Sequence, residues 1–139
     1  MNGDSARQRV IHLPAGTGRT YALGPMRAVF LADGGETADT YSISEWWLEP
    51  GTPGPGPHSH EANDDIFYVL EGRFRFQAGD SFIDAGPGDF LRVPAGVVHD
   101  FSNPGDVRAG LLNIYIPGGF EQEIPGIVAW FAAQGLPAG

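Results

Sequence analysis

Two histidines separated by one residue lie near the middle of the chain, in the segment His58-Ser59-His60. Side chains alternate between the two faces of an extended strand, so positions i and i+2 point the same way. His58 and His60 can therefore direct their rings at one point, which is what chelating a single metal ion requires. An acidic pair, Asp64-Asp65, follows shortly afterwards. A turn after His60 would bring one of these carboxylates back beside the two imidazoles.

A third histidine, His99, follows two turns that contain Gly88 and Gly96. These turns would reverse the chain so that the strand carrying His99 runs beside the segment carrying the first two histidines. The fourth histidine, His12, stands alone in a short apolar patch. We expect it at the surface or at a barrel edge rather than among the metal ligands.

The elements that position these residues are expected to be short strands separated by turns rich in Gly and Pro. Such strands at regular spacing predict an antiparallel sandwich or barrel. Residues 51–57 alternate Gly and Pro with few other residues, which excludes a helix or a central strand and indicates a stiff loop leading to the first histidine. Strands are expected at 27–32, 40–49, 73–76, 81–84, 89–93, 97–101 and 107–116, and an aromatic and β-branched run follows Asp64-Asp65 and ends at Gly72.

The period of the apolar residues changes near the C-terminus. Ile124, Ile127, Val128 and Phe131 fall at i, i+3, i+4 and i+7, which is a helical stripe. The pattern predicts one short amphipathic helix over about 123–134, packed on the outside of the sheet or over an open end. Residues 1–9 are polar and are expected to be flexible.

Composition excludes several classes of function. The chain has 139 residues, a net charge of −9, and eight basic residues that are all arginine. Nucleic acid and anionic membrane surfaces are therefore unfavourable partners. The absence of lysine and cysteine excludes Schiff-base chemistry, thiol nucleophiles, iron–sulfur clusters and thiolate-bound zinc. No apolar run of membrane-spanning length and no signal-like N-terminus are evident, so a soluble, cytoplasmic protein is expected.

The spacing His58-x-His60-x4-Asp65-x6-Gly72 resembles the first conserved motif of the cupin superfamily, and the run from Gly88 to Asn103 resembles the second. The two motifs, with the fifteen residues between them, cover 46 of the 139 residues. The resemblance implies an all-β fold, a double-stranded β-helix or jelly-roll barrel with one short C-terminal helix. It also implies one cupin domain over residues 1–139, with its metal-binding core at 51–103.

The resemblance further implies one divalent transition metal held by His58, His60, Asp65 and His99. The sequence departs from the family at Asp65, where glutamate is usual and aspartate is one methylene shorter. Asp65 could ligate directly if the backbone moves in, ligate through water, or leave the site to the three histidines. Asp64, one residue earlier, should point to the opposite face of the strand.

Three imidazoles and a carboxylate suit Fe, Mn, Ni, Co or Zn as the divalent ion. Four protein ligands on a six-coordinate ion leave two positions open, and the net positive charge favours enolates, phenolates or carboxylates. A purely stabilising zinc site is less favoured, because such sites are usually closed and rich in cysteine. The residues expected to line the substrate pocket are Phe67, Val69, Phe101 and Trp47.

The sequence around Trp46-Trp47 and Gly118-Gly119 resembles that of small single-domain cupins described as quercetin-dioxygenase-like. That resemblance implies a metal-dependent oxygenase acting on a small enolic, phenolic or carboxylate compound, with Asp65 or a nearby carboxylate as proton acceptor. A metal-dependent isomerase, epimerase or cyclase is the alternative, and a non-catalytic small-molecule binder is a third class. Cupins of this size are commonly dimers, so a homodimer is expected, with Tyr68 and Leu70 facing outward.

Overall fold

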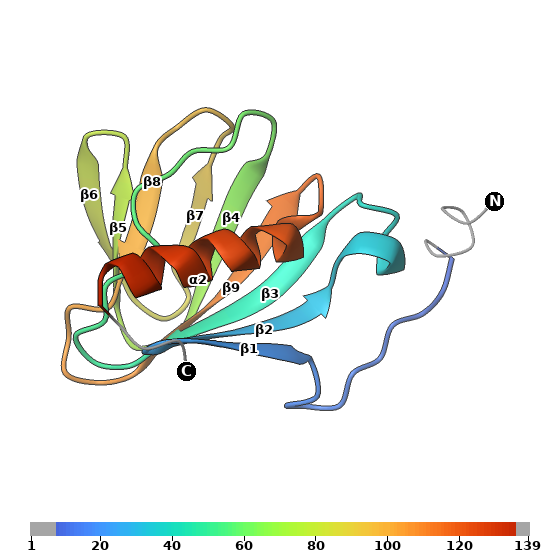
Figure 1. Ribbon diagram of the computed structural model, residues 1–139, viewed down its shortest axis with the longest axis horizontal. Helices are drawn as coiled ribbons and strands as arrows, with labels where there is room; N and C mark the ends of the chain where they lie inside the picture. Colours follow the sequence, from blue (N-terminus) through green and yellow to red (C-terminus); the bar gives the residue numbers. More distant parts are fainter. Residues whose placement is uncertain (1–7, 136–139) are drawn as a thin grey trace.

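The computed structural model describes residues 8–135, which form β-strands, two short 3-10 helices and one α-helix (Figure 1). The expected flexibility of residues 1–9 falls mostly on residues outside this range. Within the range no helix is both long and apolar enough to span a membrane. The strands are β1 (Arg19–Leu23), β2 (Met26–Ala32), β3 (Ser42–Leu48), β4 (Asp64–Glu71), β5 (Phe74–Ala78), β6 (Ser81–Ala85), β7 (Phe90–Val93), β8 (His99–Ser102) and β9 (Ala109–Ile116).

The strands form two antiparallel sheets, one of six strands in the order β1-β2-β3-β9-β4-β7 and one of three in the order β6-β5-β8. Aromatic side chains from both sheets meet between them. The ring centroid of Phe67 on β4 lies 5.2 Å from that of Phe76 on β5 and 5.8 Å from that of Phe101 on β8. A continuous apolar core therefore joins the sheets, and the predicted all-β jelly-roll barrel is confirmed. Strand β1 was not predicted.

The C-terminal helix α2 (Ile124–Ala133) confirms the predicted helix and follows the 3-10 helix η2 (Phe120–Glu123). In Figure 1 it crosses in front of strands of both sheets. Ile124 and Phe131 are buried in the core, so the apolar stripe of the helix faces inward. Trp130 packs against the proline-rich loop at Gly56, where a Cβ atom would lie 2.7 Å from the indole nitrogen. The helix thus covers the end of the barrel beside the loop that leads to His58.

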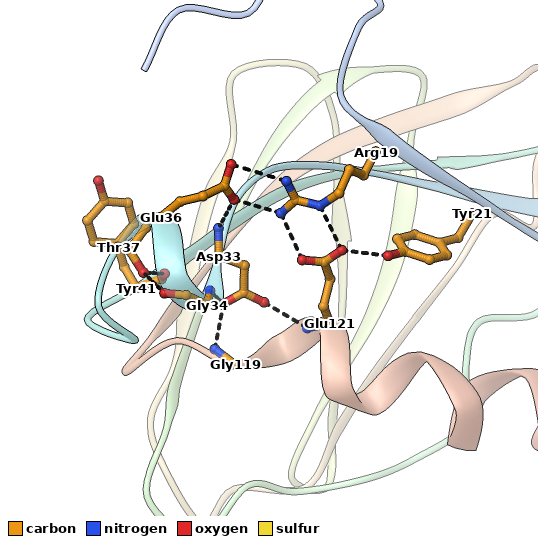
Figure 2. A network of polar contacts seen from close by, with 9 residues as sticks. All are labelled: Arg19, Tyr21, Asp33, Gly34, Glu36, Thr37, Tyr41, Gly119 and Glu121. Carbon is orange, nitrogen blue, oxygen red and sulfur yellow. Dashed lines mark hydrogen bonds and ion pairs between the residues drawn. The ribbon is translucent and has the colours of Figure 1, made fainter. Parts of the chain in front are cut away.

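The 3-10 helix η2 and the helix α2 together form the C-terminal segment, and Asp33 fixes the start of this segment (Figure 2). Its side chain caps the 3-10 helix η1 (Gly34–Glu36) and is 2% exposed. The same carboxylate accepts backbone N–H bonds from Gly119 at 2.6 Å and from Glu121 at 2.8 Å. One buried carboxylate therefore satisfies N–H groups at two helix starts that are far apart in sequence.

Arg19 on β1 adds a second link to the same segment (Figure 2). Its guanidinium pairs with Glu36 at 2.7 Å and with Glu121 at 2.8 Å, and these bonds lower the pKa of both carboxyl groups. Tyr21 donates its hydroxyl hydrogen to Glu121 at 2.6 Å. These groups are partly exposed, so the network contributes more to the placement of η2 than to the free energy of unfolding.

Replacing Asp33 with alanine should lower the free energy of unfolding by about 2–4 kcal/mol, because several N–H groups lose a charged, buried acceptor. Urea denaturation followed by tryptophan fluorescence measures the change. Asp106→Ala, at an exposed loop position, is the matched control and should have almost no effect. If the two variants unfold at the same urea concentration, the proposed importance of Asp33 is wrong.

Candidate metal centre

Backbone pairing with β8 places the two histidines of the loop. The N–H of His58 donates to the carbonyl of His99 at 3.0 Å, and the N–H of His99 donates to the carbonyl of His58 at 2.8 Å. The carbonyl of His60 accepts from the N–H of Gly96 at 2.7 Å. Earlier in the loop, a Cβ atom on Gly54 would lie 1.6 Å from the carbonyl oxygen of Phe101, so only glycine fits there. The loop therefore lies directly against β8, as the turn pattern predicted.

Four side chains converge inside the barrel: His58 and His60 from the loop, Asp65 from β4 and His99 from β8. One potential ligand atom from each lies within 4.8 Å of all the others. Asp65 Oδ2 is 2.8 Å from His99 Nε2 and 3.3 Å from His60 Nε2. Asp65 and His99 are each only 2% exposed. The structure thus brings together the residues that the sequence pattern singled out.

The outward ring nitrogen of each histidine has its own polar neighbour. A carbonyl acceptor holds the proton on Nδ1 and leaves the lone pair of Nε2 free to bind a metal, as is usual for metal-ligating histidines. The contacts of Nδ1 are with the carbonyl oxygen of Gly56 at 2.7 Å for His58, the carbonyl oxygen of Val97 at 2.9 Å for His99, and the hydroxyl of Tyr115 at 3.2 Å for His60.

Asn113 on β9 orients the carboxylate. Its side-chain Nδ2 donates to Asp65 Oδ1 at 2.7 Å and to the carbonyl oxygen of Ile66 at 3.1 Å. This leaves Asp65 Oδ2 facing the histidines. Asn113 was not among the site residues predicted from the sequence. The available signal was a polar residue at an inward-facing position of an otherwise apolar strand.

The electrostatics favour the metal-binding protonation state at Asp65 and His58, whereas at His99 they favour the protonated ring, from which a metal ion would displace a proton. Burial raises the pKa of Asp65, but the neighbouring ring of His60 and the hydrogen bonds from His99 and Asn113 outweigh it and lower the pKa to about 2. Burial lowers the pKa of His58. For His99 burial acts in the same direction, but the hydrogen bonds with Asp65 and Val97 outweigh it and raise the pKa. Asp65 is therefore a carboxylate at neutral pH, and it attracts a positive charge to this cluster.

One unsatisfied atom supports the fit of a metal ion. Nε2 of His60 is buried and makes no hydrogen bond, although Asp65 Oδ2 is 3.3 Å away. A buried polar atom without a partner is costly, and a cation placed among these side chains would satisfy it. The donor set of three imidazole nitrogens and one carboxylate oxygen also suits a divalent transition metal. The four side chains could therefore hold one such ion.

A cavity of about 240 Å³ opens beside His58 and His60. The C-terminal segment forms one wall of the cavity, and the proline-rich loop forms another. The other residues of its lining are Pro55, Pro57, Ser59, Phe120, Glu123, Gly126, Ile127 and Trp130. A much smaller space lies deeper, against Trp46, Phe67, Phe101, Asn113 and Asp65. The cluster thus lies where an open pocket meets the aromatic core.

The residues predicted to line the pocket fall in three places. Phe67 and Phe101 line the deeper space. Val69 is buried in the core and lines neither of these two cavities among the described residues. Trp47 lies on the outer face of β3, with the Arg108 guanidinium 4.7 Å from its ring centroid. The expected pocket position of Trp47 is therefore wrong, and Trp46 occupies the inner face instead.

The other predicted positions agree with the alternation of side chains. Asp64 lies on the outer side of β4 and accepts the N–H of Ala95 at 3.1 Å. It is Asp65 that joins the histidines. His12 is exposed and is not part of the cluster.

Comparisons with known proteins agree with this fold and with the position of the four-residue cluster. A family model described as the cupin domain matches residues 44–115, a stretch that contains all four clustered side chains. A quercetin 2,3-dioxygenase from Bacillus subtilis (strain 168) is 36% identical over 64 residues. That match covers 46% of this chain and only 19% of the length of the relative.

Solved structures share the fold at lower identity. KdgF from Halomonas sp. superposes with a TM-score of 0.72 at 16% identity, covering 82% of this chain and 99% of that one. A sugar phosphate isomerase from a cupin superfamily, from Silicibacter pomeroyi DSS-3, gives a TM-score of 0.66 at 21% identity, covering 76% and 74%. With the match of the family model to more than half of its length, this chain belongs to the cupin family.

Proposed function

We propose that this cupin is a metal-dependent oxygenase that acts on a small enolic or phenolic compound. The observation that carries the proposal is the convergence of three imidazoles and one carboxylate at the inner end of an open, largely apolar pocket. The local similarity to a quercetin 2,3-dioxygenase supports it. A site that binds the metal with four side chains leaves positions for a substrate and for dioxygen.

His58, His60, Asp65 and His99 are proposed as the metal ligands. A bound Fe, Mn, Co, Ni or Zn ion would supply a Lewis acid, and the redox-active members of this set would also allow electron transfer to dioxygen. Asp65 Oδ1 is engaged by Asn113, and Oδ2 faces the histidines.

The proton acceptor is therefore better sought in another carboxylate. From the sequence, Asp65 or a nearby carboxylate was expected in this role, and both oxygens of Asp65 are already engaged. Glu123 lines the same pocket as His58 and His60 and is exposed to it. We assign to Glu123 the acceptance of the proton from a substrate hydroxyl, by general base catalysis.

A Lewis-acid isomerase, epimerase or cyclase is the alternative. The observation that favours it is the same Glu123 carboxylate beside the histidine cluster, because a metal and a base suffice to move a proton next to a carbonyl group. Such an enzyme would need no dioxygen. The two functions therefore differ in a measurable requirement.

Oxygen uptake distinguishes these functions. Protein loaded separately with Fe(II), Mn(II), Co(II) or Ni(II) is expected to consume dioxygen in proportion to substrate within a panel of flavonols, catechols and β-diketones. His99→Ala should abolish the uptake, whereas His12→Ala should leave it unchanged. Equal turnover without air would favour the isomerase. Tight binding of a compound that is recovered unchanged with and without air would favour a non-catalytic binder.

We also propose a homodimer formed through the outer face of the six-stranded sheet. Strand register places Ile43, Ile66 and Ile114 side by side on that face. Next to them, Tyr68 pairs with Phe90, and these side chains are 44% and 66% exposed. A contiguous apolar area of this kind is typical of a protein interface.

Light scattering after gel filtration measures the oligomeric state. The wild type should have the mass of a dimer, and Phe90→Glu should have the mass of a monomer, because a charge would be buried in the interface. Phe82→Glu is the matched control, since Phe82 is 60% exposed but lies on β6 in the other sheet. If Phe82→Glu dissociates the protein and Phe90→Glu does not, the other sheet is the interface.

A further inference from the structure

The pocket beside His58 and His60 has an acidic side chain and no basic arginine or lysine in its described lining. Apart from the histidines, Glu123 is the one ionisable side chain in its described lining. The chain has no lysine, and no arginine lines this pocket. Of the arginines near the C-terminal segment, Arg19 is already paired with Glu36 and Glu121. Apart from the metal ion itself, an anionic ligand would therefore meet a carboxylate in the pocket and no arginine or lysine. A divalent ion together with Asp65 and Glu123 has a formal charge of zero, so Glu123 cancels the net positive charge that would otherwise attract anions.

The deeper space also presents an acceptor. Nδ2 of Asn113 faces two oxygen atoms, those of Asp65 and Ile66, so the amide orientation follows from its partners. Oδ1 of Asn113 is then buried without a hydrogen-bond partner, and the residue is 2% exposed. Asn113 lines the space that adjoins His58 and Asp65. A hydroxyl group entering this space would donate to that oxygen, whereas a deprotonated oxyanion would be repelled by it.

The remaining polar groups of the pocket are neutral. Ser59 brings a hydroxyl group and Trp130 an indole N–H to the lining. Recognition of a phosphate or a dicarboxylate normally relies on Arg, Lys or a cluster of backbone N–H groups. The combination of two acceptors and two neutral polar side chains instead suits an uncharged molecule with hydroxyl groups.

We infer that this pocket selects uncharged, hydroxyl-bearing ligands and that Glu123 is a specificity-determining residue that excludes phosphates and polycarboxylates from the metal. The inference rests on the proposed metal centre and narrows its substrate class to neutral enols, phenols and polyols. The physical reason is Coulombic. In a pocket with low-dielectric walls, a carboxylate raises the free energy of any anion that binds nearby, and the net charge of −9 adds to this effect.

The test compares anionic and neutral ligands on Co(II)-loaded protein, with binding followed by the visible spectrum of the ion. Azide and inorganic phosphate are the anions, and imidazole, at about pH 8 where it is uncharged, is the neutral ligand. Glu123→Gln should tighten azide and phosphate binding by roughly three- to tenfold and leave imidazole binding unchanged. The gain should shrink as salt rises from about 0.01 M to 0.5 M. Glu123→Asp should behave as the wild type.

Glu49→Gln is the matched control, because it removes one negative charge at an exposed residue lining a different cavity. Its anion affinities should stay at the wild-type values. Equal anion affinities in the wild type and Glu123→Gln would overturn the inference, as would an equal gain in Glu49→Gln or an equal gain for imidazole. Protein that binds no Co(II) would overturn both this inference and the metal centre. Protein that binds Co(II), shows the selectivity and consumes no dioxygen would contradict the oxygenase alone.

Discussion

Replacing His58 or His99 with alanine is expected to lower metal affinity by more than about a hundredfold while the barrel stays folded. Removing an outer hydrogen-bond partner of a ligand already costs about 10–100-fold, so removing a ligand should cost more. The fold should survive because the bridge between these two residues uses their backbone N–H and carbonyl groups, which alanine retains. Metal content after dialysis and the circular dichroism spectrum measure the two outcomes.

His12→Ala is the control for a histidine outside the cluster and should retain the full metal content. His60→Ala should behave like the other two ligand variants. The His60→Ala variant tests direct ligation well, because Nε2 of His60 has no hydrogen-bond partner in the described structure that its loss could disturb. If the double variant His58→Ala/His99→Ala keeps one metal ion per chain, the centre described here is wrong.

The second large effect is expected at Asp65. Asp65→Asn should lower metal affinity by about a hundredfold, because it removes the negative charge and presents an N–H group either to Asn113 or to the histidines. Asp64→Asn is the matched control, since it makes the same chemical change one residue away on the outer face. Its effect should be at most a few-fold. Isothermal titration of the metal-free variants with Co(II) or Ni(II) measures both affinities.

Asp65→Glu tests how the carboxylate binds. The family's usual glutamate would have to fit where Asp65 is 2% exposed and already 2.8 Å from His99 Nε2. The extra methylene should therefore leave the affinity unchanged or lower it, because a closely packed site has no room for it. A gain in affinity would mean that Asp65 reaches the metal only through water. Equal, small effects of Asp64→Asn and Asp65→Asn would indicate a site of three histidines.

The local pattern of the sequence was enough to predict much of the fold and the ligand cluster. Alternating apolar residues and Gly/Pro turns predicted most of the strands, and the i, i+3, i+4, i+7 stripe predicted the helix at Ile124–Ala133. The spacing of His58 and His60 and the turns before His99 predicted their convergence. These properties depend on the period of the backbone, which is a local quantity.

Strand β1 (Arg19–Leu23) lacked such a signal. Its residues are mostly exposed or half-buried, and it pairs only with β2, at the edge of the sheet. Without a buried face, a strand shows little of the alternation on which a prediction depends. Arg19 and Tyr21 of this strand instead donate hydrogen bonds to Glu121 and so hold the C-terminal segment in place.

The contacts between distant segments were decided by the tertiary structure. Alternation placed Trp46 and Trp47 on opposite faces of β3, but only the packing of the second sheet determined that Trp46 faces the site. Asn113 reaches Asp65 because β4 and β9 pair in one register, in which Asn113 stands opposite Phe67. Glu123 enters the pocket because Asp33 anchors η2 across more than eighty residues of sequence. Such contacts depend on which surfaces bury each other, and no periodicity within a single segment records that choice.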